Sequence, residues 1–145
     1  MQKNLIFRFD PTNADIENVR EIVTSTNFFH DHEIPVAVEL VEERLEKGLD
    51  SGYHFIFADT DGKTIAYACY GEIPCTKGSY DLYWIATHND YRGKGIGKTL
   101  MAEVERHIKS IGGRVIYIET SSKKMYEPTQ KFYENYGCTT DAILK

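Results

Sequence analysis

Apolar side chains recur along the chain with two periods, and each period predicts one kind of element. Ile16, Val19 and Val23 are spaced three or four residues apart, as on the buried face of a helix. The same spacing recurs later, and prolines and glycines mark helix starts and ends. We expect helices over about 14–26, from Pro35 to the stop at Gly48, over Gly93–Ile111, and from about Tyr126 to Tyr136.

Stretches rich in aromatic and β-branched residues predict the strands. Asp61-Gly62 separates two such stretches and is a strong signal for a hairpin. We expect strands over Asn4–Phe9, Tyr53–Ala58, Thr64–Glu72, Tyr80–Thr87 and Val115–Glu119, with one more short strand after Gly137. The order β-α-α-β-β-β-α-β-α-β indicates an α/β fold with a mixed sheet, joined first by a hairpin and later by helical crossovers.

Length and composition narrow the range of functions. The 145 residues suit a single domain spanning 1–145. The net charge of −5 counts against nucleic acid as a partner, and no apolar run approaches the ~20 residues of a membrane span. Three cysteines without C-x-x-C spacing, and histidines without H-E-x-x-H, favour a cytoplasmic protein without a metal site.

The most informative segment runs from Tyr91 to Thr99, between a predicted strand and a predicted helix. Its three alternating glycines permit a tight turn that exposes consecutive N–H groups. The helix that follows adds unpaired amides and a partial positive charge. With Arg92, Lys94 and Lys98 in the same segment, these features favour the binding of a pyrophosphate or another anion.

Three anion-binding patterns compete for this segment, beside a structural alternative in which the glycines serve only a tight connection. A Walker A loop needs a glycine where Arg92 stands, so its spacing fails by one residue. A Rossmann fingerprint needs G-x-G-x-x-G after the first strand, but the spacing here is G-x-G-x-G after several strands. The third pattern, R-x-x-G-x-G, fits Arg92–Gly97.

On these residues the chain resembles the GNAT superfamily of acyl-CoA-dependent N-acetyltransferases. The family's acyl-CoA loop matches Arg92–Gly97, its central strand resembles Asp81–Thr87, and its late F-Y-x-x-x-G motif matches Phe132–Gly137. Cys138 departs from the aromatic residue that usually follows. The chain is similar to a small bacterial subgroup whose substrate is unassigned.

The resemblance implies a GNAT-like fold, with a mixed, mostly antiparallel central sheet, splayed central strands and about four flanking helices. Relatives usually continue past the last helix with two strands, whereas only Thr139–Lys145 follows Cys138 here. We therefore expect the C-terminal strand to be missing. An unpaired sheet edge would favour a homodimer through this end.

The resemblance also implies acetyl-CoA as the cosubstrate, with no metal, held where the Tyr80–Thr87 and Val115–Glu119 strands splay. Backbone groups of one strand would pair with the pantetheine, and the glycine loop would bind the pyrophosphate. A strand N–H near Ile85 would polarise the thioester carbonyl. The implied cofactor-binding residues are Ile85, Ala86 and Thr87 for the pantetheine. For the pyrophosphate they are Arg92, Gly93, Lys94, Gly95, Ile96, Gly97 and Lys98.

Two residues are expected to perform the proton transfers. The family motif places a tyrosine at Tyr133, and a tyrosine is protonated at neutral pH, so it can donate to the leaving thiolate. Glu119, at the end of the splayed strand, is the first candidate for the base that deprotonates the amine. Asp81, Glu72 and His88 are lesser candidates, and ordered water is the alternative. The structural alternatives are that Tyr133 packs on the CoA arm or the core, and that the Glu119 carboxylate caps the N–H group of Thr120 or Ser121.

The acceptor is expected to be a small primary amine, amino-acid-like or polyamine-like. Six aromatic residues lie on predicted strands, and those outside the core could line a pocket that suits a cationic amine. They are Tyr53, Phe55, Phe57, Tyr67, Tyr70 and Tyr83. Glu33 and Glu39 on the second helix could contribute carboxylates, whereas Cys69 is not expected to be a nucleophile. A non-catalytic acyl-CoA sensor is the alternative function.

Overall fold

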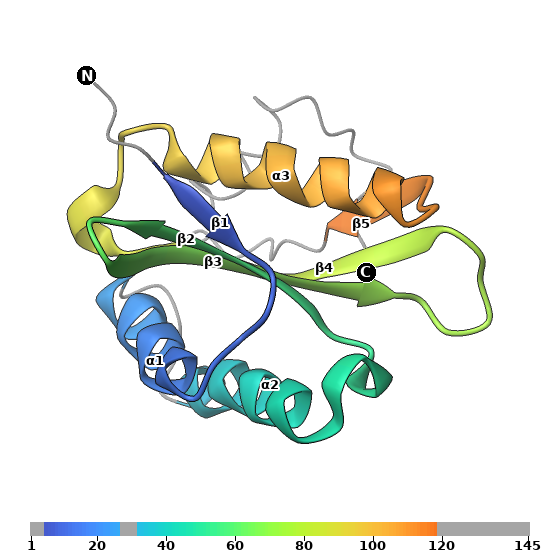
Figure 1. Ribbon diagram of the computed structural model, residues 1–145, viewed down its shortest axis with the longest axis horizontal. Helices are drawn as coiled ribbons and strands as arrows, with labels where there is room; N and C mark the ends of the chain where they lie inside the picture. Colours follow the sequence, from blue (N-terminus) through green and yellow to red (C-terminus); the bar gives the residue numbers. More distant parts are fainter. Residues whose placement is uncertain (1–4, 27–31, 119–145) are drawn as a thin grey trace.

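The computed structural model describes residues 5–26 and 32–118, which form one open sheet with helices on both faces (Figure 1). Within these residues, two short 3-10 helices join the three α-helices and five strands. The elements are β1 (Ile6–Arg8), α1 (Ala14–Thr26), α2 (Glu33–Lys47), η1 (Gly48–Ser51), β2 (His54–Thr60), β3 (Lys63–Glu72), β4 (Ser79–Thr87), η2 (Asn89–Tyr91), α3 (Ile96–Ser110) and β5 (Val115–Ile118).

The strands lie side by side in the order of the sequence, from β1 to β5. The first four pair antiparallel, while β5 runs parallel to β4. Two parallel neighbours need a crossover, and α3 provides it. The mixed, mostly antiparallel sheet predicted from the sequence is therefore confirmed for the described part of the chain.

Each face of the sheet has its own apolar core. On one face α3 packs through Leu100, Val104 and Ile108 against residues of the strands, and all three are buried. On the other face α1 and α2 cover Phe55, Phe57 and other buried strand residues. Figure 1 shows the two layers, with α3 on one side of the strands and α1 and α2 on the other. Alternate residues of one strand therefore enter different cores.

The boundaries differ from the sequence prediction where glycine and proline mark an end. The helix expected over Gly93–Ile111 begins at Ile96, because Gly93 and Gly95 both adopt left-handed backbone conformations that no α-helix contains. The helix expected to start near Pro35 begins at Glu33, which places Pro35 in its first turn. The expected helix over 126–136 and the strand after Gly137 lie outside the described residues.

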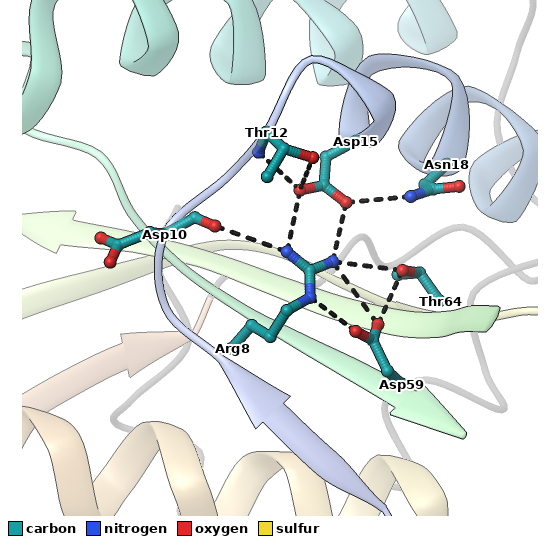
Figure 2. Close-up of polar contacts among 7 residues, drawn as sticks. All are labelled: Arg8, Asp10, Thr12, Asp15, Asn18, Asp59 and Thr64. Atoms are coloured by element: carbon teal, nitrogen blue, oxygen red, sulfur yellow. Dashed lines mark hydrogen bonds and ion pairs between the residues drawn. The ribbon is translucent and has the colours of Figure 1, made fainter. Parts of the chain in front are cut away.

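A partly buried charge network ties β1 to α1 and to the β2–β3 hairpin (Figure 2). The guanidinium of Arg8 donates to Asp15 on α1 at 2.9 and 3.1 Å, and to Asp59 on β2 at 2.5 Å. The Asp15 carboxylate, which has no exposed surface, also accepts the N–H of Thr12 at 2.8 Å. Charged groups this deep require such paired contacts, so the network fixes α1 against the sheet.

Among residues 5–26 and 32–118, the structure has no helix that is long and apolar enough to span a membrane.

Candidate active site

The loop between η2 and α3 owes its shape to two glycines. Gly93 and Gly95 have φ angles of +79° and +77°, a region that costs other residues about 1–2 kcal/mol. A Cβ atom added to either glycine would meet no atom of the described residues within 4 Å. The glycines are therefore needed for backbone conformation and not for close packing, and the Cβ position of each is open.

The N-terminus of α3 faces this open space without a side-chain cap. Gly95 is the N-cap residue and provides no side-chain hydrogen bond, and the first turn contains no acidic residue. The N–H and the hydroxyl of Thr99 both donate to the Gly95 carbonyl at 3.1 Å. The regular backbone hydrogen bonds of α3 therefore start at the N–H of Thr99. The amides of Ile96, Gly97 and Lys98 have no carbonyl one turn back within the helix. They can donate to an anion, which the helix dipole attracts.

Three cations extend this positive region. Arg92 and Lys94 stand in the loop itself, and Lys98 lies in the first turn of α3; all three are exposed. Arg92 also donates to the Asn89 side chain at 3.4 Å, a contact that links it to η2. The structure thus brings together Arg92–Lys98, the segment that the sequence predicted for pyrophosphate binding, around one helix end.

The β4 strand carries a bulge at Tyr83. Cys69 on β3 pairs with Trp84, whereas the next residue, Tyr70, pairs with Leu82, so Tyr83 is the extra residue. The bulge reverses the alternation of side chains. Leu82 enters the core under α3, and Trp84 packs on the core under α1 and α2, although they are two residues apart.

The same strand has different neighbours before and after the bulge. Ser79–Leu82 pair with Val115–Ile118 of β5. From Tyr83 to Thr87, the neighbouring strand within the described part of the chain is β3 alone. Ile85, Ala86 and Thr87, which the sequence assigned to pantetheine, lie in this second segment. Their outward backbone groups can pair with an extended ligand, as an added strand would.

The lesser base candidates have distinct environments. The Glu72 carboxylate accepts the N–H of Gly78 at 3.1 Å and closes the β3–β4 hairpin. His88 Nδ1 accepts the N–H of Asp90 at 3.1 Å and caps η2. In contrast, the Asp81 side-chain oxygen Oδ1 is buried and has no hydrogen-bond partner among residues 5–26 and 32–118, and burial raises the pKa of this carboxyl. Glu72 and His88 therefore each have a structural contact with a backbone N–H, whereas Asp81 Oδ1 has no such contact among the described residues.

The six aromatic residues divide between the core and the surface, and a pocket wall formed by the residues outside the core stays a prediction. Phe55, Phe57, Tyr67 and Tyr70 are fully buried core residues. Tyr53 is half-buried and Tyr83 is 41% exposed, and their rings meet edge to face with centroids 5.7 Å apart. Burial, and then the charge of Asp81, raise the pKa of Tyr83. Cys69 is buried with a raised pKa, which suits an inert thiol and not a nucleophile.

The first candidates for proton transfer, Glu119 and Tyr133, lie outside the described residues. Glu119 directly follows Ile118, the last residue of β5, in the sequence.

Sequence reasoning missed one polar cluster, which lies under α3. The Tyr70 hydroxyl and His107 Nδ1 are 2.5 Å apart, and the His54 ring stacks on Tyr70. The hairpin turn at Asp61-Gly62 was a signal for the pairing of His54 with Tyr70, because it sets the register of β2 against β3. No local pattern relates either residue to His107 on α3.

A family model described as the acetyltransferase (GNAT) family matches residues 16–138. The chain belongs to the GNAT family of acetyltransferases. This GNAT chain is 44% identical to a GNAT-family protein from Desulfovibrio desulfuricans, with a TM-score of 0.91 over 94% of this chain and 86% of that one. No curated protein matches it.

Two more distant structures share the fold of this GNAT protein. The aminoglycoside N-acetyltransferase AAC(6')-Iy in complex with CoA is 20% identical, with a TM-score of 0.72 over 96% of this chain and 90% of that one. The PaiA N-acetyltransferase from Thermoplasma acidophilum in complex with coenzyme A is 20% identical, with a TM-score of 0.68 over 92% and 89% of the two chains. The resemblance derived from the sequence motifs is thereby confirmed at the level of family and fold.

Proposed function

We propose that this acetyltransferase moves the acetyl group of acetyl-CoA to a primary amine of a small molecule, amino-acid-like or polyamine-like, by direct attack in a ternary complex. The observation that carries the proposal is the left-handed Gly93–Gly95 loop that opens onto the uncapped N-terminus of α3. An anion at this position gains several amide donors together with the charges of Arg92, Lys94 and Lys98.

The residues present fit an acyl-CoA molecule along β4. The amides of Gly93–Lys98 would bind the pyrophosphate. Backbone groups of Ile85–Thr87 would pair with the pantetheine, because this part of β4 has β3 on one side and no second strand among residues 5–26 and 32–118. Structures of two proteins that share this fold contain CoA, which supports the assignment.

The reaction then needs little covalent chemistry from the protein. The neutral amine nitrogen attacks the thioester carbonyl carbon, a C–N bond forms, and the C–S bond breaks. The proton lost by the amine goes to a base, and the departing sulfur takes a proton from an acid. A strand N–H near Ile85 would polarise the thioester carbonyl. Orientation of the two substrates on one strand supplies much of the rate.

We assign the proton transfers to the residues that the family motifs indicate. Glu119 would accept the amine proton, directly or through water, and Tyr133 would protonate the thiolate. A thiolate is a tolerable leaving group, so the contribution of Tyr133 is expected to be about 10²-fold.

Isothermal titration with acetyl-CoA tests the proposal, with ATP as the control ligand. We expect acetyl-CoA to bind the wild-type protein and to bind Gly95→Trp at least tenfold more weakly, because the indole would fill the open space beside the α3 N-terminus. Gly112→Trp is a matched control: Gly112 is also left-handed, at φ +91°, also has open space, and follows α3 at its other end. This variant should bind acetyl-CoA as the wild type does.

Release of free thiol in the presence of small amines then tests catalysis. Thiol release that depends on both acetyl-CoA and a small amine supports the enzyme. Binding of ATP without binding of acetyl-CoA would overturn the proposal, and equal loss of acetyl-CoA binding in both tryptophan variants would overturn the assigned site.

A further inference from the structure

A connecting turn, His88–Tyr91, joins β4 to the glycine loop and includes η2. The end of β4, which precedes this turn, would pair with the pantetheine. The Arg92–Gly97 loop, which follows it, would bind the pyrophosphate. The connecting turn therefore sets how the two parts of the cosubstrate site lie relative to each other.

Hydrogen bonds between close neighbours give the connecting turn its shape. The N–H of Tyr91 donates to the His88 carbonyl at 2.9 Å, and the N–H of Asp90 donates to His88 Nδ1 at 3.1 Å. The N–H of Arg92 donates to the Asn89 carbonyl at 3.4 Å. Because these contacts join residues that are adjacent or nearly so in the sequence, they do not fix the turn to the rest of the fold.

Two further N–H groups attach the connecting turn to distant segments. The N–H of His88 donates to the Ile65 carbonyl on β3 at 2.7 Å and continues the pairing of β3 with β4. The N–H of Asn89 donates to the hydroxyl of Ser25 at 2.9 Å, across 64 residues of sequence. Ser25 lies in the last turn of α1. The end of α1 thus holds the chain at the point where it leaves the sheet (Figure 1).

The Ser25 hydroxyl is itself held in place. It donates to the Ile22 carbonyl one turn earlier in α1, at 2.7 Å. This bond uses the hydroxyl proton, so the oxygen presents its lone pairs to the N–H of Asn89. Ile22 and Val23 are buried in the core on this face of the sheet, which fixes the end of α1. The connecting turn therefore has an acceptor at a defined position.

Asn89 relates this acceptor to the predicted anion site. Its side-chain oxygen accepts a hydrogen bond from the Arg92 guanidinium at 3.4 Å, and its carbonyl accepts the Arg92 N–H at the same distance. Gly93, with φ +79°, comes directly after Arg92. A displacement of Asn89 therefore moves the charge of Arg92 and the start of the left-handed loop together. Hydrogen bonds weaken steeply with misalignment, so such a displacement lowers the affinity for a phosphate ligand.

The bond between Ser25 and Asn89 is suited to positioning more than to stability. Asn89 is exposed and Ser25 is half-buried, so water can take the place of the hydroxyl. Its removal leaves no deeply buried group without a partner, and the fold as a whole loses little. The position of the connecting turn, in contrast, depends on the direction of this bond.

We propose that Ser25 is a positioning residue for the pyrophosphate site of this acetyltransferase. Its hydroxyl holds Asn89, and through Asn89 it places Arg92 and the glycine loop for the cosubstrate. This inference rests on the proposed function, in which that loop binds the pyrophosphate of acetyl-CoA. Without the hydroxyl the site keeps all of its donors and charges but loses their alignment.

Isothermal titration with CoA compares the wild type with Ser25→Ala, which keeps α1 because alanine is a strong helix former. We expect the Kd for CoA to rise about fivefold or more. Ser25→Thr should restore the wild-type Kd, since a threonine hydroxyl can also bond the carbonyl one turn back, as Thr26 does to Val23 at 2.8 Å. Ser110→Ala is the matched control: Ser110, in the last turn of α3, donates to the His107 carbonyl at 2.6 Å, and its loss should leave the Kd unchanged.

Amide hydrogen exchange of the free protein separates positioning from a general loss of stability. In Ser25→Ala we expect exchange to accelerate about threefold or more at Asn89 and in the Arg92–Gly97 loop. The amides of β2 and β3 should exchange at wild-type rates. Uniform acceleration over the whole chain would assign any change in Kd to stability and would overturn the positioning role.

The outcomes also separate this inference from the proposed function. If wild type and Ser25→Ala bind CoA equally, or if Ser25→Ala and Ser110→Ala lose the same affinity, the role of Ser25 is wrong and the cosubstrate site stands. Failure of Ser25→Thr to restore the Kd would likewise contradict a role of the hydroxyl. Failure of the wild type to bind CoA would overturn the proposed function and this inference with it. Far-UV circular dichroism of each variant shows that the fold is intact.

Discussion

The Tyr70 hydroxyl on β3 and Nδ1 of His107 on α3 lie 2.5 Å apart and link the sheet to the helix. His54 stacks on Tyr70 and meets the His107 ring edge-on, with centroids 5.7 Å apart. Burial lowers the pKa of both histidines, and the charge of His107 lowers that of His54 further. The core under α3 therefore holds two neutral imidazoles at neutral pH.

This cluster predicts a loss of stability in mild acid. A histidine in the unfolded chain takes up a proton near pH 6.5, whereas His54 and His107 in the folded protein do so at lower pH. Between these pH values the unfolded chain binds more protons than the folded protein. The contribution of the two histidines to stability is complete above about pH 6.5. It falls as the pH drops toward and through their pKa values in the folded protein, by at most about 1.4 kcal/mol per pH unit for each histidine. Urea unfolding between pH 7.5 and 5 measures this slope. His107→Gln should make it shallower, and an identical slope in the variant would contradict the explanation.

The Arg8–Asp15 ion pair predicts a second loss at lower pH. Burial raises the pKa of Asp15, but hydrogen bonds from Arg8, Asn18 and Thr12 outweigh it, so the folded pKa is lowered. The contribution of this carboxylate is complete above about pH 4 and is lost as the pH falls through the folded pKa.

Removal of the same carboxylate should destabilise the protein at neutral pH. Asp15→Asn leaves the guanidinium of Arg8 with Asp59 as its remaining charged partner, and we expect a cost of about 2–3 kcal/mol in the free energy of unfolding. Glu17→Gln breaks an exposed ion pair with Arg20 at 3.0 Å and should change stability by less than about 0.5 kcal/mol. Urea unfolding at pH 7 compares them, and equal effects would refute the role of burial.

Gly71→Ala should destabilise the protein. The new methyl group would push against the Gly52 carbonyl and the Tyr83 ring, at a cost of about 1–3 kcal/mol in the free energy of unfolding. Urea unfolding at pH 7 measures this cost, and an unchanged free energy of unfolding would contradict the close contact at Gly71.

Tyr133→Phe should lower kcat about 10²-fold, because water must then protonate the thiolate. Acetyl-CoA binding, measured by titration, should be unchanged. Tyr136→Phe lies in the same segment of the sequence and should retain wild-type kcat. Unchanged kcat in Tyr133→Phe would remove Tyr133 from the chemistry.

Glu119→Gln should lower kcat most strongly on the acidic side of the pH profile, where the wild-type base still accepts a proton from the amine. The pH dependence of kcat in both proteins measures this effect. A profile of unchanged shape would favour ordered water as the proton acceptor.

Local patterns determined the elements and the cosubstrate loop. The spacing of Ile16, Val19 and Val23 predicted α1, and Asp61-Gly62 predicted the β2–β3 hairpin, because a helical face and a two-residue turn depend on neighbours in the sequence. The glycines of Arg92–Gly97 predicted an anion site, since positive φ angles and a helix start are local properties. The family and the fold followed from these motifs and their order.

Tertiary structure decided what lies across the sheet. The Tyr83 bulge appears only when β4 pairs with β3, and it alone places Tyr83 over Gly71. Gly52, Gly71 and Tyr83 come from three segments of the chain, so no spacing in the sequence predicts their contact. Tertiary packing buries the Asp81 oxygen Oδ1, which distinguishes its environment from those of Glu72 and His88. It also places His107 beside Tyr70. Local sequence fixes backbone geometry, whereas register and packing between distant segments determine which side chains share a site.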